Sequence, residues 1–320
     1  MKSLKQIDNL KSHDKKIVAV IVTYNRLNLL KECLDALFKS DYHTDILVVN
    51  NNSNDGTKEY LDDIKNQDML TKFYVFNLSE NLGGAGGFNY GIREASKLDY
   101  DRIWIMDDDC IANKNTLSEL VKIDELVNGN FGFLSSKVLW TDGTICKTNV
   151  QRKRIARKIK DFDSNYVNVD FASFVSLYVK RVDALNVGLP IKEFVIWTDD
   201  LEWTRRLTYT KIYEAAKPGF LCNKSIVTHK CANNFGVSIV YDTKERLDRY
   251  KYIYRNDVYC FKREGIGGNI FIIFRNLYHI FKVLLLSKTE KLLKIKIIVD
   301  GFFDGLRFSP KIEYVNNKME

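Results

Sequence analysis

Short apolar runs alternate with amphipathic segments along the first third of the chain. The β-branched run of residues 16–24 predicts a buried strand, and apolar side chains at helical spacing follow it over residues 29–38. The same order repeats, with strands predicted at 45–49, 73–76 and 103–106 and helices at 57–64 and 88–98. Because strand and helix alternate, we expect an α/β fold with a largely parallel sheet covered on both faces.

The pattern is less regular beyond residue 110. A helix is predicted to begin near Asn115, and further strands are predicted within 131–140, over 170–182 and over 224–230. The segment FVIWTDDLEWTRRL, residues 194–207, predicts a helix that starts with acidic side chains, which favour the positive end of the helix dipole.

Each of the first four predicted strands ends in a polar cluster. The clusters are Thr23–Arg26, Asn50–Asp55, Asn81–Gly87 and Asp107–Asp109. Any one of them alone is more often a turn. In parallel sheets, however, ligands bind at the carboxyl ends of the strands, so we expect the four clusters to converge on one edge.

Three adjacent carboxylates, Asp107, Asp108 and Asp109, follow the buried strand directly. They would repel one another unless a cation lay among them, and hard oxygen ligands suit Mg²⁺ or Mn²⁺. The alternative is an acidic loop in which one aspartate caps the following helix. The flanking polar clusters favour the metal site.

A nucleotide that carries phosphate is the ligand that these clusters favour. Arg26 offers a fixed positive charge for phosphate, and short amides and carboxylates can hydrogen-bond a base or ribose. Glycine N–H groups at a helix start can face an anion. The residues concerned are Asn50, Asn52, Asp55 and glycines 83, 84, 86 and 87.

Other nucleotide motifs are missing. The first turn, TYNRLN, has no glycine, so the GxGxxG dinucleotide fingerprint is excluded there. A P-loop requires a Gly-Lys dipeptide, which the chain lacks. The chain also lacks HExxH and GxSxG.

Four segments together resemble a known family. VAVIVTYNR, DILVVNNNSNDGT, NLGGAGGFNYGI and WIMDDD are similar to segments of the family 2 glycosyltransferases, which have the GT-A fold and use nucleotide-sugar donors. NLGGAGG and the triple aspartate resemble the galactofuranosyl- and rhamnosyltransferase branch. The resemblance covers about residues 17–229. Asn50 stands where the family usually has an acidic residue.

The resemblance implies an architecture. We expect a GT-A (nucleotide-diphospho-sugar transferase) fold, an α/β fold with a mostly parallel central sheet flanked by helices and a C-terminal helical appendage. Residues 1–15 would be a polar extension and 16–235 the catalytic domain. Its nucleotide-sugar half would be 16–110 and its acceptor half 111–235. A basic, aromatic-rich helical region would occupy 236–320.

The resemblance also implies roles for individual residues. In the W-x-D-D-x-E element, Asp200 is the expected catalytic base, and Trp197, Asp199 and Glu202 are expected to contact the acceptor. His229 is expected to bind Mn²⁺ or Mg²⁺ with Asp107 and Asp109, although a lone histidine is usually structural. The expected donor-binding residues are Thr23, Tyr24, Asn25, Arg26, Asn50, Asn52, Asp55, Asn81, Gly83, Gly84, Asp107 and Asp108.

Cysteine usage indicates reduced thiols. The six cysteines form no CxxC pair and show no regular spacing, which argues against a disulfide framework. Cys231 lies close to His229, but no second Cys/His pair at ligand spacing supports a zinc site.

The net charge of +8 indicates an anionic partner. Residues 244–296 hold thirteen Lys or Arg against five Asp or Glu, with aromatic residues interleaved. This pattern favours an amphipathic helical region on an anionic membrane, the alternatives being a core-packing appendage or a homo-oligomer contact. Residues 147–160 carry seven basic and no acidic side chains, which fits either a flap over an anionic acceptor or a solvated loop.

The N-terminus lacks an apolar signal core, and no clean 18-residue apolar run is evident. We therefore expect a cytoplasmic protein without a transmembrane helix, held peripherally on the inner face of the plasma membrane.

The favoured function is an inverting, metal-dependent glycosyltransferase. It would move a sugar from UDP-galactofuranose or dTDP-rhamnose to a hydroxyl of a growing cell-surface glycan, free or lipid-linked, and would bind no nucleic acid. One alternative is a basic nucleic-acid-binding protein, for which aromatic residues among basic ones are typical. The other is a nucleotidyltransferase, which should carry a lysine-bearing glycine loop after the first strand.

Overall fold

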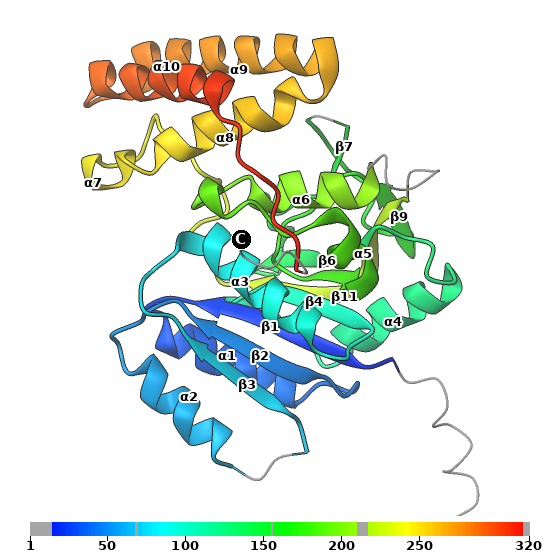
Figure 1. Ribbon diagram of the computed structural model, residues 1–320. Coiled ribbons are helices and arrows are strands. Elements are labelled where there is room, and N and C mark those ends of the chain that lie inside the picture. The colour runs from blue at the N-terminus through cyan, green and yellow to red at the C-terminus, as the bar shows by residue number, and fades with distance from the viewer. Residues whose placement is uncertain (1–14, 68–69, 155, 210–216, 316–320) are drawn as a thin grey trace, which may run out of the picture.

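The computed structural model describes residues 15–67, 70–154, 156–209 and 217–315. A nine-stranded sheet runs through this part of the chain, in the order β3-β2-β1-β4-β10-β6-β11-β5, with β9 paired to β11 (Figure 1). Four strands match the first four predicted ones: β1 (Ile17–Thr23), β2 (Asp45–Asn50), β3 (Phe73–Asn77) and β4 (Arg102–Asp107).

These four strands are parallel and in register at their carboxyl ends. Thr23 pairs with Asn50, Asn50 pairs with Asn77, and Val22 pairs with Asp107. The polar residues that follow the strands therefore start at one level of the sheet, as the sequence predicts.

Helices cover both faces of this parallel half. Leu30 and Leu34 of α1 are buried in the core on one face, together with Leu61 of α2. Phe88 and Ile92 of α3 are buried on the other face. The helices are α1 (Leu27–Phe38), α2 (Thr57–Lys65) and α3 (Gly83–Lys97). Helix α3 begins five residues earlier than the sequence predicts, at Gly83 instead of Phe88, because the glycines let it approach the sheet: a Cβ on Gly87 would lie 2.5 Å from Val22 Cγ1.

The second half of the sheet is mixed. Strand β10 is antiparallel to both β4 and β6, whereas β11 is parallel to β6 and antiparallel to β5 and β9. The elements are β5 (Cys110–Ala112), α4 (Thr116–Leu126), β6 (Phe133–Trp140), β9 (Tyr166–Val169), β10 (Leu177–Lys180), α5 (Arg181–Val187), η1 (Lys192–Phe194), α6 (Asp199–Thr208) and β11 (Gly219–His229). The expected α/β fold is confirmed, with antiparallel pairs confined to this half.

One sequence expectation needs correction here. The strand predicted over residues 170–182 is only the four-residue β10, since helix α5 begins at Arg181. The basic segment of residues 147–160 contains a short hairpin of β7 (Arg152–Lys153) and β8 (Arg157–Lys158), and its role as a flap or a solvated loop stays a prediction.

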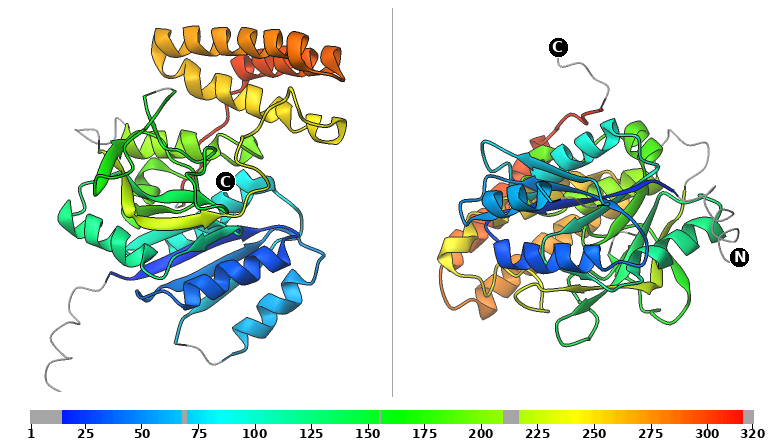
Figure 2. Two further views of the ribbon diagram at one scale, coloured as in Figure 1. Left: turned by 180° about the vertical axis from the view of Figure 1, so that it is seen from behind. Right: turned by 90° about the horizontal axis from the view of Figure 1, so that it is seen from below.

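Among the described residues, four helices follow β11: α7 (Lys244–Leu247), α8 (Tyr250–Lys262), α9 (Gly265–Leu286) and α10 (Lys291–Arg307). Figure 1 shows α8, α9 and α10 as a layer above α6, and Figure 2 shows the same layer from behind. Gly301 and Gly305 let α10 approach α8, because a Cβ at either would lie within 2.6 Å of an α8 side-chain atom. After α10 the chain runs back to helix α3, where the Glu313 carboxylate accepts a hydrogen bond of 2.6 Å from Arg93.

Helix α9 is long enough, and over an 18-residue window apolar enough, to cross a membrane by length and composition. Scattered polar residues such as Asn269 and His279 interrupt its apolar run in the sequence, and the expectation of no transmembrane helix stays a prediction. Only 17% of that window is buried. One face of α9 nevertheless packs on the protein, where Arg275 lies 2.5 Å from Asp257 of α8. All six cysteines are free, as expected.

Candidate active site

Asp107 ends β4, and Asp108 and Asp109 form the turn between β4 and β5, at the carboxyl edge of the sheet. Asp108 is buried and points back towards β1, where it accepts a hydrogen bond of 2.8 Å from Thr23 Oγ1. Arg26 Nη1 lies 3.2 Å from Asp108 and 2.8 Å from Asp109. Burial raises the pKa of Asp108 to about 7, against the opposing charge of Arg26. Arg26 and Thr23 therefore orient the carboxylates from β1 and its following turn.

His229 reaches the aspartates through strand register. It ends β11 and pairs with Cys110, the first residue of β5. Ligand atoms of Asp107, Asp109 and His229 all lie within 4.8 Å of one another. The triple aspartate and the lone histidine thus meet, as the sequence predicts.

This cluster fits a divalent cation. His229 Nε2 lies 3.1 Å from Asp109 Oδ1, a buried oxygen that accepts no hydrogen bond from any other described residue. Burial, followed by the charge of Asp109, raises the pKa of Asp107 to about 6, although His229 and Arg26 act in the opposite direction. A cation bound by oxygen and imidazole ligands would take the place of the proton between His229 and Asp109 and remove the remaining repulsion between the two carboxylates.

Asn149 fixes the orientation of the histidine. Its Oδ1 lies 2.8 Å from His229 Nδ1, and its Nδ2 donates to Ser173 Oγ at 3.0 Å, which sets the direction of the amide. A carboxamide oxygen only accepts, so Nδ1 carries the proton and Nε2 faces Asp109. Outer partners of this kind hold metal-ligating histidines.

His229 is protonated on both nitrogens when no cation is bound. Burial is the largest single effect and lowers its pKa, but contacts with Asp109, Cys146 and Cys231 together outweigh burial and raise the pKa to about 12. Burial would raise the pKa of Asp109, but contact with His229 lowers it overall. A divalent cation at this position would therefore displace the Nε2 proton.

Hydrogen bonds between the first two loops shape the predicted donor side. Asn25 Oδ1 accepts from Asn54 N at 2.8 Å, and Asp55 Oδ2 accepts from Leu27 N at 2.9 Å. Asn50 is buried; its Oδ1 accepts from Ser53 N and its Nδ2 donates to Asn77 Oδ1. These side chains hold the loops together. Tyr24 and Asn52, in contrast, are exposed at the rim.

The glycine turn lies against the loop that precedes α6. Gly83 has φ +74°, and a Cβ there would lie 2.4 Å from Val195 O, so only glycine fits. Gly83 N donates to Asn81 Oδ1, and Ala85 N donates to Val195 O. One of the expected anion-binding N–H groups, that of Gly83, and the neighbouring N–H of Ala85 are therefore used inside the protein. Gly84 has no heavy atom within 4 Å of its Cβ position and faces open space.

Asp199 and Asp200 begin helix α6, after a backbone in which Val195, Trp197 and Thr198 all have φ between +65° and +72°. Burial raises the pKa of Asp200 to about 6, with Arg152 acting in the opposite direction. Burial, and then the charge of Asp200, raises the pKa of Asp199 well above its usual range. Asp107 adds to the raised pKa of Asp199, and Asp200 to that of Asp107, so the acid pair on α6 lies close enough to the triple aspartate for their charges to interact.

Helix α8 holds this unusual backbone in place. Asn256 Nδ2 donates to three carbonyls, those of Phe194, Ile196 and Trp197, at 3.0 to 3.2 Å. The Trp197 ring lies 5.5 Å from the ring of Tyr250, at 56°. The predicted sugar-facing tryptophan is therefore partly covered by the C-terminal helices.

Glu202 points away from the aspartates. It accepts from Arg206 Nε at 2.8 Å and lines a cavity of about 470 Å³ between α6 and the α8–α9 junction. Phe171 and Tyr209 supply aromatic walls. Four arginines also line it, at positions 152, 205, 206 and 263.

Sequence reasoning missed several residues of the site. Arg152 acts on Asp200, Asn149 orients His229, and Asn256 supports the loop before α6. Each comes from a segment distant in sequence, and none belongs to a recognisable motif. Only the basic character of residues 147–160 hinted that an arginine from this segment contributes.

Comparison with known proteins gives a family match over part of the chain. Residues 18–128 match the family described as glycosyl transferase family 2. Galactofuranosyltransferase GlfT1 of Mycolicibacterium smegmatis is 38% identical over 98 residues, which are 31% of this chain and 31% of that protein. The chain thus spans less than half the length of this curated relative.

Two solved structures share the fold over most of the chain. The mannosyltransferase PcManGT from Pyrobaculum calidifontis, in complex with GDP-Man and Mn²⁺, has a TM-score of 0.53 at 14% identity, covering 93% of this chain and 77% of that one. GalNAc-T7 with UDP, GalNAc and Mn²⁺ has a TM-score of 0.56 at 12% identity, covering 90% and 55%. The chain therefore has the GT-A fold of glycosyltransferases, and its residues 18–128 match the family 2 model.

Proposed function

We propose that the protein is an inverting, metal-dependent glycosyltransferase that moves a sugar from a nucleotide donor to a hydroxyl of a growing cell-surface glycan. The observation that supports this most is the meeting of two acidic groups at one edge of the sheet. Asp107 and Asp109 cluster with His229, and the pair Asp199–Asp200 faces them from α6. A metal-binding group and a separate carboxylate are the two parts that such a reaction needs.

Asp107, Asp109 and His229 would hold Mn²⁺ or Mg²⁺, which supplies neutralising charge for the departing diphosphate. Asp108 does not join this set in our proposal, because Thr23 and Arg26 hold it towards β1. Its role is to keep the turn between β4 and β5 in shape. Asn50 and Asp55 shape the loops that would take the base and ribose.

Asp200 is proposed as the general base. It would take the proton of the acceptor hydroxyl as that oxygen attacks the anomeric carbon, on the face opposite the leaving diphosphate. The transition state would resemble an oxocarbenium ion. A pKa of about 6 suits this role, since the carboxylate is ionised at neutral pH yet more basic than an ordinary aspartate.

UDP-galactofuranose or dTDP-rhamnose is proposed as the donor. The name of the relative GlfT1 supports galactofuranose, and the UDP and GDP-Man complexes of the structural neighbours support a nucleotide sugar. Asn50 stands where the family usually has an acidic residue, so the contact of this side chain with the nucleotide base would be uncharged. The acidic site argues against the nucleic-acid-binding alternative.

We propose that α9 and α10 lie on the inner face of the plasma membrane, close to a lipid-linked acceptor. Phe274 is 68% exposed and Leu292 is 84% exposed on the outer side of these helices. Further exposed apolar residues are Ile266, Ile270, Ile273, Leu277, Tyr278, Phe281, Leu284, Leu285, Leu286 and Phe303. With the basic excess of residues 244–296, this surface fits an anionic bilayer.

A donor screen tests the proposal. Nucleotide release is measured with several UDP- and dTDP-sugars plus Mn²⁺, with and without a chelator, and Asp109→Ala serves as the inactive control. We expect release from at least one donor that needs both Mn²⁺ and Asp109. Release that persists in the chelator, or in Asp109→Ala, would overturn the metal-dependent mechanism.

A further inference from the structure

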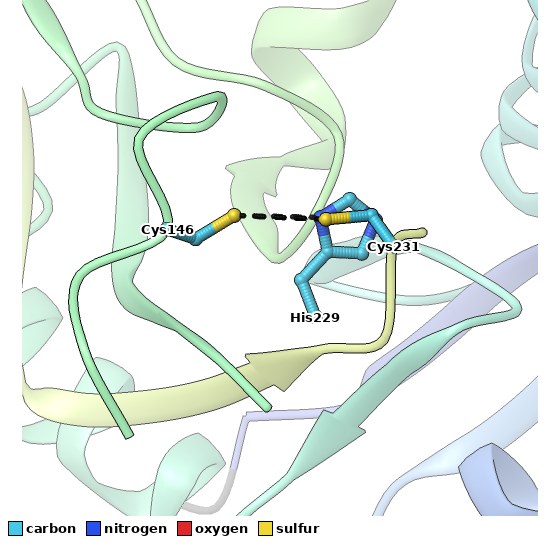
Figure 3. Close-up of side chains that lie close together, drawn as sticks. All are labelled: Cys146, His229 and Cys231. Carbon is cyan, nitrogen blue, oxygen red and sulfur yellow. Dashed lines mark hydrogen bonds between the residues drawn. The ribbon is translucent and has the colours of Figure 1, made fainter. Parts of the chain in front are cut away.

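Two cysteine side chains, Cys146 and Cys231, lie beside His229 and form with it a cluster of three soft and borderline ligands (Figure 3). Cys146 comes from the loop after β6, and its N–H donates to Val138 O at 2.9 Å. Cys231 follows His229 by two residues, and its carbonyl accepts from Trp140 Nε1 at 3.0 Å. These bonds tie both cysteines to β6, so their position does not depend on a ligand.

The distances match a zinc-like ligand set. Cys146 Sγ lies 3.9 Å from Cys231 Sγ and 3.9 Å from His229 Nδ1. A tetrahedral Zn²⁺ with Zn–S of about 2.3 Å and Zn–N of about 2.0 Å requires about 3.8 Å between two sulfurs and about 3.6 Å between sulfur and nitrogen. Small side-chain shifts would therefore bring three ligands onto one cation.

A cation could reach this cluster from solvent. Cys231 is partly exposed, whereas Cys146 and His229 are buried. Asn149 Oδ1 lies 3.0 Å from Cys146 Sγ and 2.8 Å from His229 Nδ1, so this oxygen would have to yield or become a fourth ligand. On binding, the two thiols would lose their protons to solvent, with no transfer of electrons.

The imidazole of His229 faces a different partner through each nitrogen. If Nε2 binds the cation beside Asp107 and Asp109, Nδ1 keeps its proton and donates to Asn149. If Nδ1 binds a cation with the cysteines, Nε2 keeps its proton and Asp109 accepts it, as in the carboxylate–histidine–zinc arrangement. A neutral imidazole has one free lone pair, so it serves one site at a time.

We propose that Cys146, His229 Nδ1 and Cys231 form a second, inhibitory site for a thiophilic divalent cation such as Zn²⁺, which excludes the hard cation from the aspartate cluster. Thiolates select Zn²⁺ over Mn²⁺ and Mg²⁺, so the two sites differ in the metal they take. The exclusion of the hard cation rests on the proposed function, in which His229 binds a metal beside Asp107 and Asp109. The cysteine site itself does not depend on that function.

The cysteine site is tested with metal alone. The full chain, reduced with a phosphine and kept free of oxygen, is titrated with Co²⁺, a spectroscopic substitute for Zn²⁺. We expect one equivalent to give a thiolate-to-cobalt charge-transfer band. Cys146→Ser and Cys231→Ser should each abolish the band and weaken Zn²⁺ binding by more than about 100-fold, beyond the loss typical of an outer partner. Cys260→Ser, on α8, is the matched control.

The result that overturns the site is a titration with no charge-transfer band, or one that both cysteine variants leave unchanged. Because no sugar donor is present, failure of the proposed glycosyl transfer leaves this result untouched.

The exclusion is tested separately by calorimetry of UDP binding. Zn²⁺ should raise the Mn²⁺ concentration needed for half-maximal UDP binding by at least about tenfold in the wild type, because His229 is withdrawn, and should have little effect in Cys146→Ser. An equal effect of Zn²⁺ on both proteins would contradict competition through the cysteine site.

Discussion

Thr198 donates a hydrogen bond to Asp257, with 2.9 Å between Oγ1 and Oδ1, and so joins the residue before Asp199–Asp200 to helix α8. Asp257 in turn lies 2.5 Å from Arg275 of α9. The proposed base is thus connected to the C-terminal helices by two polar contacts. These helices support the site and are more than an appendage.

The first prediction concerns Asn256, which holds three carbonyls of the loop before α6. In Asn256→Ala these carbonyls lose their donor, so the free energy of unfolding should fall by about 1–3 kcal/mol. The backbone at Val195, Trp197 and Thr198, where positive φ costs about 1–3 kcal/mol each, should relax and lower kcat. Denaturant titration measures the free energy of unfolding, and kcat and donor affinity are measured on the same variant. Donor affinity should stay unchanged. Asn269→Ala, exposed on α9, is the control. A wild-type kcat in Asn256→Ala would show that the loop needs no support.

The second prediction concerns the metal ligands. Asp109→Ala should lose Mn²⁺-dependent UDP binding with the fold intact, because it removes a ligand from the cluster. His229→Ala should weaken Mn²⁺ affinity by about 10- to 100-fold or more. Calorimetry of UDP with Mn²⁺ measures both variants, and circular dichroism verifies the fold. Wild-type binding by Asp109→Ala would remove Asp109 from the site, and an unchanged Mn²⁺ titration would make His229 a structural residue.

The third prediction concerns pH. A general base works only when deprotonated, so kcat should fall as pH falls through the pKa of Asp200, which burial raises to about 6. An ordinary aspartate, with a pKa of about 3.9, would keep the rate constant down to about pH 5. The pH profile of kcat at saturating Mn²⁺ gives the acid limb, and Asp200→Asn should lose it. An acid limb near pH 4 in the wild type would contradict the raised pKa.

The fourth prediction concerns the membrane. Phe274→Asp should reduce sedimentation with anionic vesicles, because it puts a charge on the exposed apolar face of α9. Binding of the wild type should also fall steeply with salt, since the attraction is screened over about 10 Å at 0.1 M. Leu70→Asp, at a fully exposed position outside the C-terminal helices, is the matched control. Equal binding to neutral and anionic vesicles would count against the proposed surface.

The parallel half of the fold could be predicted from sequence because its signals are local. Buried β-branched runs mark the strands, and polar residues at their ends mark one edge, which register between β1, β2 and β3 brings to one level. The early start of α3 was missed, because only the packing of Gly87 on Val22 makes a helix of glycines favourable there.

The cysteine cluster and the support from α8 could not be predicted in this way. Cys146 and His229 are 83 residues apart, and they meet because β6 and β11 are neighbours in the sheet. Spacing in the sequence therefore gave no sign of a Cys/His cluster at Cys231. Asn256 likewise lies 62 residues from Phe194, whose carbonyl it binds, and a single asparagine in a helix has no distinctive pattern.

The most direct test of the account is the turnover of Asp200→Asn, measured as nucleotide release with an active donor and acceptor at saturating Mn²⁺. Asparagine keeps the shape of the side chain but cannot take a proton. If Asp200 is the general base, kcat should fall by about 10²- to 10⁴-fold while donor affinity stays nearly unchanged. Asp199→Asn should then have a milder effect. A near-normal kcat in Asp200→Asn, with the loss appearing in Asp199→Asn or Glu202→Gln instead, would contradict it.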